Sequence, residues 1–227
     1  MKTQIPFDTY KTDKGNLKIT VLGHASLLFQ YEGKNIYIDP YSKVADFSLL
    51  PKADLILITH EHLDHLDEKA IDCVKKADTQ FIASSAAAKM LGQGESIGNG
   101  GKSSFHDIEI EAVPAYNIVH QREPGVAFHP KGIGNGYVLT FDNIKVYVAG
   151  DTENIPEMDT LKGKIDIAFL PKNLPYTMDD EMFIDAARRI QPKILYPYHM
   201  SEFDEAKIGK ALKDTSIELK IRPMSNL

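Results

Sequence analysis

Short apolar runs near the start of the chain predict a protein rich in β-structure. Residues 17–22, 26–31 and 35–39 each combine apolar, β-branched and aromatic positions in runs of strand length. The turn Glu32-Gly33-Lys34-Asn35 predicts a hairpin between the last two of these runs. The run 55–58 is apolar at every position, which is typical of a strand buried on both faces.

Helices and strands are predicted to alternate through the rest of the chain. Helical periodicity indicates helices at 67–76, 84–91, 178–190 and 203–212. Strands are predicted at 80–83, 105–114, 136–141, 145–149, 165–170, 193–196 and 217–221, with a hairpin turn at Asp142-Asn143. The glycine-rich stretch 92–102 predicts a loop.

A weak internal repeat predicts how these elements are arranged. Three pairs of aspartates share one offset of 112 residues: Asp39 and Asp151, Asp54 and Asp166, and Asp67 and Asp179. We therefore expect two similar halves, at about 17–112 and 136–221, each an apolar sheet covered by helices. Stacked sheet to sheet, they would form a single domain over residues 1–227, an α/β protein with four αββα layers.

Composition excludes several classes of protein. Hydrophobic residues make up 43% and charged residues 26% of the 227 positions, which are ordinary globular values. Neither a signal peptide nor an apolar run of about 18 residues is found, so we expect no membrane span and a cytoplasmic location. The net charge of −6 and the scattered lysines argue against a nucleic-acid surface and leave a small molecule as the expected partner.

The segment after the buried run 55–58 carries the clearest chemistry. Within six residues it places His60, His62, Asp64 and His65. Side chains of alternating direction in such a turn would let His60 and His62 face one ion while Asp64 and His65 face another. Histidine nitrogens and aspartate oxygens are ligands that zinc accepts, and a site without cysteine also admits manganese or iron.

The pattern His-x-His-x-Asp-His after an apolar strand resembles the signature of the metallo-β-lactamase superfamily. Gly-His-Ala-Ser at His24, Asp39-Pro40, Gly-Asp-Thr at Asp151 and Tyr-His at His199 are similar to the branch that includes ascorbate-6-phosphate lactonase and N-acyl-phosphatidylethanolamine phospholipase D. The resemblance implies the αββα fold and two metal ions. It also implies that Asp151 bridges them and that His199 is the last ligand.

The chain departs from the superfamily pattern at one ligand. Asn117 stands where superfamily members usually carry a histidine, and an amide oxygen is a poorer zinc donor than imidazole. Our preferred substitute is His129, in Phe-His-Pro-Lys-Gly, and the second choice is His120. A first ion held by two histidines and solvent is the remaining alternative, and we expect His106 on the surface.

Further residues are expected around the metal ions. Asp39, at a strand end, is predicted to accept the outer N–H of a metal-bound histidine. His24, also at a strand end, could point into the site. Lys131, Lys172 and Tyr176 are expected in loops at the same edge, where they could bind a phosphate or carboxylate, although solvated loop residues are the commoner case.

These residues predict a hydrolase. Two ions about 3.5 to 4 Å apart lower the pKa of a shared water from near 16 toward 7. The resulting metal-bound hydroxide would attack an ester, lactone, amide or phosphodiester of a small or lipid-like substrate, and Asp64 could pass a proton to the leaving group. The alternative is a non-catalytic binding protein whose metal site is incomplete because of Asn117.

Overall fold

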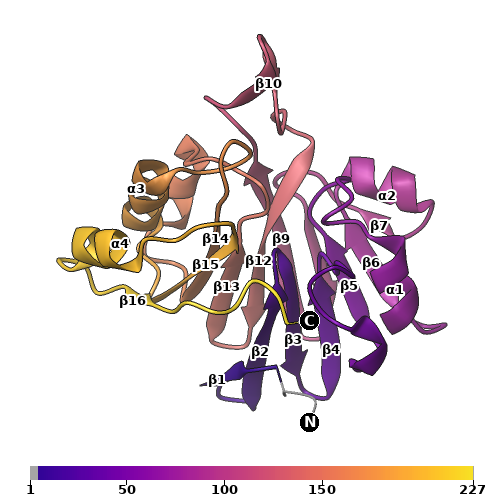
Figure 1. Ribbon diagram of the computed structural model, residues 1–227. Helices are drawn as coiled ribbons and strands as arrows, with labels where there is room; N and C mark the ends of the chain where they lie inside the picture. The colour runs from indigo at the N-terminus through magenta and orange to yellow at the C-terminus, as the bar shows by residue number, and fades with distance from the viewer. Residues whose placement is uncertain (1–4, 227) are drawn as a thin grey trace.

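Two seven-stranded sheets lie face to face in the computed structural model, which describes residues 5–226 (Figure 1). The first sheet comes from the N-terminal half, and its strands follow chain order. Strands β1 to β4 pair antiparallel, whereas β4 to β7 pair parallel. The strands are β1 (Phe7–Lys11), β2 (Asn16–Gly23), β3 (Ser26–Tyr31), β4 (Lys34–Ile38), β5 (Leu55–Ile58), β6 (Gln80–Ala83) and β7 (Glu95–Ser96).

The second sheet repeats this plan. Strands β8, β9, β12 and β13 pair antiparallel, and β13 to β16 pair parallel. The strands are β8 (Lys102–Phe105), β9 (Ile108–Ala115), β12 (Gly134–Phe141), β13 (Ile144–Val148), β14 (Ile167–Lys172), β15 (Ile194–Met200) and β16 (Glu218–Leu219). A separate hairpin of β10 (Gln121–Glu123) and β11 (Val126–Ala127) projects from the body at the top of Figure 1.

Helices cover the outer face of each sheet. α1 (Glu68–Val74) and α2 (Ser85–Leu91) pack on the first sheet, and α3 (Asp180–Ile190), α4 (Glu205–Leu212) and the 3-10 helix η2 (Pro156–Leu161) pack on the second. A short 3-10 helix, η1 (Phe47–Leu49), lies between β4 and β5. The predicted αββα sandwich is therefore confirmed. None of the helices within residues 5–226 is long and apolar enough to cross a membrane.

Side chains start and end these elements as the sequence dictates. The carboxylate of Asp67 accepts backbone N–H bonds from the first turn of α1, and Asp179 does the same for α3. Ser84 caps α2 in the same way. α2 ends at Gly92, whose φ of 65° lies in the left-handed region that suits glycine.

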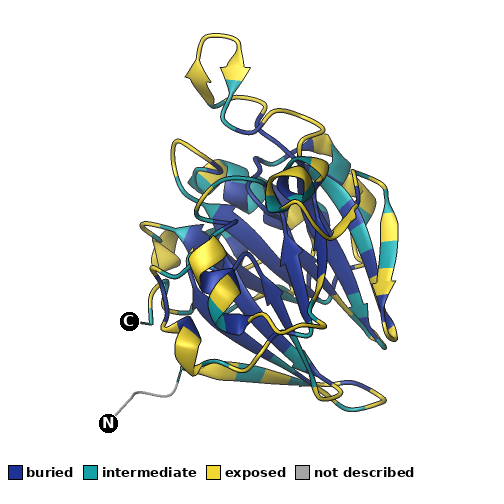
Figure 2. Cartoon of the chain, turned by 90° about the vertical axis from the view of Figure 1, so that its right-hand side faces the viewer, coloured by how far each residue is buried: buried dark blue, intermediate teal, exposed yellow. Residues whose placement is uncertain are grey.

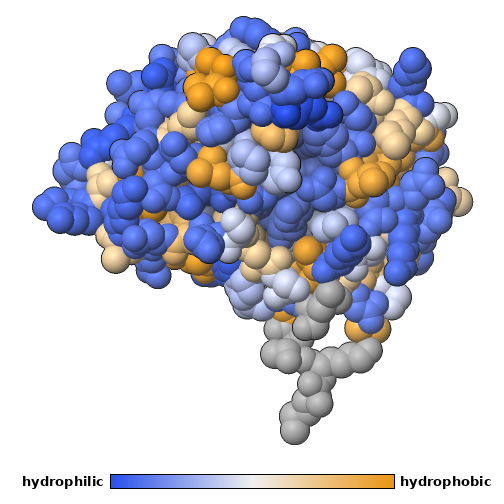
Figure 3. Space-filling model, turned by 45° about the horizontal axis from the view of Figure 1, so that its top comes forward, coloured by the Kyte–Doolittle hydropathy of each residue, from blue (hydrophilic) through white to orange (hydrophobic). Residues whose placement is uncertain are grey.

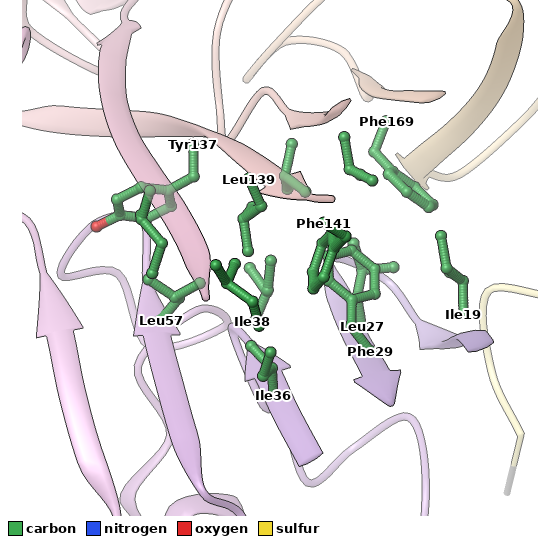
Figure 4. Close-up of a cluster of buried hydrophobic side chains, with 14 of the residues drawn as sticks. Ile19, Leu27, Phe29, Ile36, Ile38, Leu57, Tyr137, Leu139, Phe141 and Phe169 are labelled. Atoms are coloured by element: carbon green, nitrogen blue, oxygen red, sulfur yellow. The ribbon is translucent and has the colours of Figure 1, made fainter. Parts of the chain in front are cut away.

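The space between the sheets is filled by large apolar side chains. Phe29 of the first sheet and Phe141 of the second meet edge to face with ring centroids 5.7 Å apart, and Phe169 packs beside them (Figure 4). All three are fully buried, and each contributes about 2 kcal/mol through its burial. Figure 2 shows the buried strands running through the body of the molecule, which fixes the strand ends that carry the site.

Several strand predictions were wrong. The predicted strand 105–114 is two strands, because a turn with φ of 51° at His106 separates β8 from β9. β1 and the β10–β11 hairpin were not predicted, and the predicted loop 92–102 contains β7. β15 continues to Met200, beyond the predicted end at residue 196.

The pairing registers revise the repeat. Tyr37 of β4 lies opposite Ile56 of β5, and Tyr147 of β13 lies opposite Ala168 of β14. The two tyrosines therefore hold equivalent places in the two sheets, and they are 110 residues apart. Because Asp39 and Asp151 are 112 residues apart, Asp151 lies two residues beyond the position that corresponds to Asp39. The shared offset of 112 for that pair was therefore a coincidence of spacing.

Candidate metal centre

The ends of several strands deliver acidic and histidine side chains to one place. Three groups have ligand atoms that all lie within 4.8 Å of one another: His24 with Asp64, His65 and His199; His60 with His62 and His129; and His60 with His65 and Asp151. Because His60 and His65 each belong to two groups, the three groups form one continuous cluster.

The turn after β5 contributes four of these side chains. Asp39, directly after β4, holds the turn from behind and is fully buried. Its carboxylate accepts hydrogen bonds from Thr59 N at 2.8 Å, from Thr59 Oγ1 at 2.6 Å and from His65 Nδ1 at 2.7 Å. The bond to Nδ1 leaves Nε2 of His65 facing Asp151, 3.4 Å from Oδ1.

Asp64 lies between two histidines at the more exposed side of the cluster. Its Oδ2 is 2.9 Å from His24 Nε2 and 3.4 Å from His199 Nε2. The backbone N–H of His199 donates to the carbonyl of His24 at 2.8 Å, which ties β15 to the β2–β3 turn. Both histidines have φ values in the left-handed region, 49° and 46°, which a non-glycine residue adopts at some energetic cost.

His129 approaches the cluster from the loop between β11 and β12. Its Nε2 is 3.2 Å from His62 Nδ1 and 3.4 Å from Asp151 Oδ2. Asn117 stands behind it and accepts a hydrogen bond from Nδ1 of the ring at 2.7 Å. His120 pairs instead with Glu153 at 2.7 Å and belongs to none of the three groups.

The donor set fits divalent metal ions. His65 Nε2, Asp151 Oδ1 and His199 Nε2 are buried, yet none has a hydrogen-bond partner. Native proteins rarely leave buried polar atoms unpaired, and a metal ion satisfies imidazole nitrogens and carboxylate oxygens together.

The electrostatics of the cluster favour metal binding. Burial lowers the pKa of His60 well below its ordinary value and lowers the pKa of His129 to about 4, so both imidazoles are neutral near pH 7. Burial disfavours a charge on Asp151, but the neighbouring His199 and His65 outweigh burial and hold the pKa of this carboxyl well below its usual range. Neutral His60 and His129 beside an ionised carboxylate suit a divalent ion. Burial by itself would lower the pKa of His65, but Asp151 and Asp39 outweigh burial and raise this pKa well above its ordinary value, so an ion bound there would displace a proton from His65.

The residues expected around the ions have different surroundings. Lys172 ends β14 rather than lying in a loop, and its ammonium pairs with Asp180 at 2.9 Å. Lys131, in a turn, pairs with Glu157 at 2.7 Å. Tyr176 is 45% exposed, and its ring packs against Phe128.

Two residues of the site were not found from the sequence. Thr59 joins Asp39 to the turn that carries the candidate ligands, and a hydroxyl directly after a buried strand was the signal for it. Glu153 is fully buried and receives hydrogen bonds from the loop that begins at Asn117. Its position two residues after Asp151 was the only signal. His106 is exposed, as predicted.

Comparison with known proteins agrees with this geometry. Residues 18–199 match the β-lactamase superfamily domain. A UPF0173 metal-dependent hydrolase of Thermococcus kodakarensis is 33% identical over 195 residues, which are 81% of this chain and 84% of that protein. Another from Archaeoglobus fulgidus is 27% identical over 221 residues, covering 90% and 94%.

Solved structures show the same fold. A crystal structure from Parabacteroides distasonis has a TM-score of 0.92 and 49% identity, covering 98% of this chain and all of that one. The metallo-β-lactamase fold protein YhfI of Bacillus subtilis has a TM-score of 0.72 at 14% identity, covering 91% and 96%. This chain therefore belongs to the β-lactamase superfamily, as a member of the UPF0173 family of metal-dependent hydrolases.

Proposed function

We propose that this hydrolase uses two metal ions. The observation that carries the proposal is that three buried ligand atoms, described above, have no hydrogen-bond partner and belong to one cluster of candidate ligands. One ion would be held by His60, His62 and His129, and the other by Asp64, His65 and His199.

Asp151 is the residue we assign between the two ions. Its Oδ2 lies 3.4 Å from Nε2 of His129 and 3.4 Å from Nε2 of His199, which belong to the two different ligand sets. Zinc is the ion we expect first, since imidazole and carboxylate ligands suit it, and manganese or iron would also suit such a set.

The residues around the ions prepare hydrolysis. Two divalent ions, when bound, lower the pKa of a water molecule from about 16 toward 7 and polarise the substrate oxygen. Burial lowers the pKa of His24, so its neutral ring can donate a hydrogen bond to Asp64 and orient it. Burial disfavours a charge on Asp64, but His199 and His24 outweigh burial and hold its pKa far below the usual range, so this carboxyl is ionised near pH 7. Asp64, whose side chain is 36% exposed, would therefore accept a proton from the attacking water before passing it to the leaving group.

The pocket beside the cluster indicates the kind of substrate. Phe128, Pro130 and Ile133 line it together with His60 and His62. These apolar side chains would contact an apolar group next to the bond that is cleaved, as in a small or lipid-like ester, lactone, amide or phosphodiester. On the face in Figure 3 the apolar residues form small separate patches among polar ones.

Elemental analysis with a parallel hydrolysis assay tests this function. We would compare wild type with His129→Ala, using generic ester, lactone, amide and phosphodiester substrates. His106→Asn is the matched control, because it removes an exposed imidazole outside the cluster and asparagine tolerates the left-handed backbone there. About two ions per chain are expected in wild type and control, and about one ion with little turnover in His129→Ala.

The opposite result is equally clear. Wild-type protein that retains no metal and shows no turnover after zinc, manganese or iron is supplied would refute the proposal. Two ions retained by His129→Ala with normal turnover would instead remove His129 from the ligand set.

A further inference from the structure

We propose that Glu153 is a positioning residue that sets the orientation of His129 through the loop 117–120. This inference rests on the proposed function, because it concerns one ligand of the first metal ion. Glu153 does not touch the cluster itself. It acts through Asn117, the residue that stands where the superfamily usually has a histidine.

The carboxylate of Glu153 holds the loop by its backbone. Oε2 accepts the N–H groups of Ile118 at 2.6 Å and Val119 at 2.7 Å, and Oε1 accepts the N–H of His120 at 2.7 Å. Oε1 also lies 2.7 Å from Nδ1 of the His120 ring. Three successive backbone N–H groups around one carboxylate form an anion-binding concavity.

Burial of side chains does not hold the middle of this loop. Ile118 is 51% exposed and Val119 is 61% exposed, so neither side chain anchors the segment to the core. Glu153, by contrast, is fully buried. Asn117, at the start of the loop, is itself buried, and its backbone N–H donates to the carbonyl of His129 at 2.9 Å. The hydrogen bonds to the Glu153 carboxylate are therefore what holds the exposed part of the loop after Asn117.

The same carboxylate fixes which way the Asn117 amide points. Asn117 Nδ2 donates to Glu153 Oε1 at 3.0 Å and to the carbonyl of Tyr176 at 2.9 Å. Because both of these partners are hydrogen-bond acceptors, the Nδ2 atom of the amide must face them, and Oδ1 then faces the opposite way. On that side Oδ1 accepts the backbone N–H of His129 at 2.9 Å, a donor that cannot be reversed.

The orientation of the amide decides the tautomer of His129. Asn117 Oδ1 lies 2.7 Å from Nδ1 of the ring, and an amide oxygen only accepts. Nδ1 must therefore carry the proton, which leaves the lone pair on Nε2, the atom that faces His62 and Asp151. A metal ligand displaced from its usual position is thus held by the residue that replaced it.

Glu153→Gln tests the inference. Glutamine keeps the size of the side chain, but an NH₂ group replaces one of the two carboxylate oxygens. That NH₂ group would face backbone N–H donors, so the hydrogen bonds to that oxygen would be lost. We expect faster hydrogen exchange at the amides of residues 118–120 and a mixture of His129 tautomers in metal-free protein. The affinity for one of the two zinc ions should fall about 10- to 100-fold, as for other residues that orient a ligand.

Asp166→Asn is the matched control. Asp166 also accepts a backbone N–H, that of Lys145 at 2.8 Å, and its side chain also forms an ion pair, with Lys193. It lies just before β14, whereas Asp151 and His199 lie toward the far ends of the neighbouring strands. Its zinc affinity, loop exchange and tautomer should match those of wild type.

Hydrogen exchange and nitrogen NMR of the histidine rings separate the outcomes. Unchanged exchange, tautomer and zinc affinity in Glu153→Gln would overturn the inference. If the variant does not fold, the metal-free wild type still decides, because a His129 ring protonated at Nε2 contradicts it. Wild type with the expected tautomer and loop protection but no affinity for zinc, manganese or iron would refute the proposed function and leave this positioning in place.

Discussion

Asp39 and Asp151 follow strands that hold the same place in the two sheets, but their carboxylates have opposite surroundings. Both β4 and β13 join an antiparallel neighbour to a parallel one. Asp39 comes directly after its strand and has both oxygens hydrogen-bonded to Thr59 and His65. Asp151 comes two residues later, in the middle of the ligand cluster, and its Oδ1 has no hydrogen-bond partner.

The two extra residues explain the difference. Gly150 has a φ of 67°, and a Cβ at this position would lie 2.6 Å from the carbonyl oxygen of Asn135. Glycine therefore lets the chain turn tightly against β12, and the turn carries Asp151 forward into the cluster. One aspartate supports the turn after β5 from behind, whereas the other lies among the candidate ligands with its Oδ1 unpaired.

The largest effect is expected from Asp151→Ala. Since Asp151 approaches ligands of both proposed ions, its loss should reduce turnover at least about a thousandfold, or about 4 kcal/mol in the activation free energy. The metal content should fall below one ion per chain. The free energy of unfolding of the metal-free protein should fall less than in Asp39→Ala, because His65 and His199 lose a buried carboxylate beside them but no backbone N–H loses its acceptor.

Measured turnover, metal content and denaturant unfolding of one preparation would check this. Two retained ions in Asp151→Ala would show that the aspartate is not a ligand and that the contrast with Asp39 has another origin.

Asp39→Ala should give the reverse pattern. Its buried carboxylate pairs with Thr59 and His65, so its removal leaves the Thr59 N–H and the His65 Nδ1 without their acceptor and takes one of the partners of the Thr59 hydroxyl. We expect the free energy of unfolding to fall by about 3 kcal/mol. Turnover should fall about 10- to 100-fold, because His65 loses the partner that orients it. Equal unfolding curves for Asp39→Ala and wild type would contradict the supporting role.

The four candidate ligands in the turn after β5 could be predicted from sequence because they lie close together along the chain. His60, His62, Asp64 and His65 lie in one short turn after a strand whose apolar run is unmistakable. The αββα layers followed from the same kind of evidence, since buried strands and amphipathic helices each carry their own periodicity.

The surroundings of the other candidate ligands depend on contacts between residues far apart in the sequence, which no local pattern indicates. Glu153 meets the Asn117 loop from 36 residues away, and whether His120 or His129 reaches the cluster is decided by how that loop turns. The turn at His106 was missed for a related reason, because apolar alternation through Ile108 makes the segment read as one strand.

Removing the metal should affect stability to an intermediate degree. Ions that bind only the folded protein stabilise it by about 2.7 kcal/mol when their concentration is a hundred times the dissociation constant. For a chain of this size, chelation should lower the melting temperature by about 5 to 10 °C. Differential scanning calorimetry with and without a chelator measures the shift. Asp151→Ala should show almost none, and a full shift in that variant would contradict its place among the ligands.

The smallest effect is expected from Thr59→Val, which separates the two bonds that Asp39 makes to one residue. Valine keeps the shape and the backbone N–H bond at 2.8 Å, but it removes the hydroxyl that donates to Asp39 at 2.6 Å. We expect a loss of about 1 kcal/mol in unfolding free energy and less than about a tenfold loss of zinc affinity. Urea unfolding and a zinc competition titration measure the two. The Thr59 hydroxyl also lies 3.0 Å from His60 Nδ1. If Thr59→Val lowers zinc affinity as much as Asp39→Ala does, the hydroxyl orients His60 directly. Asp39 would then act on the metal centre through Thr59 as much as through His65.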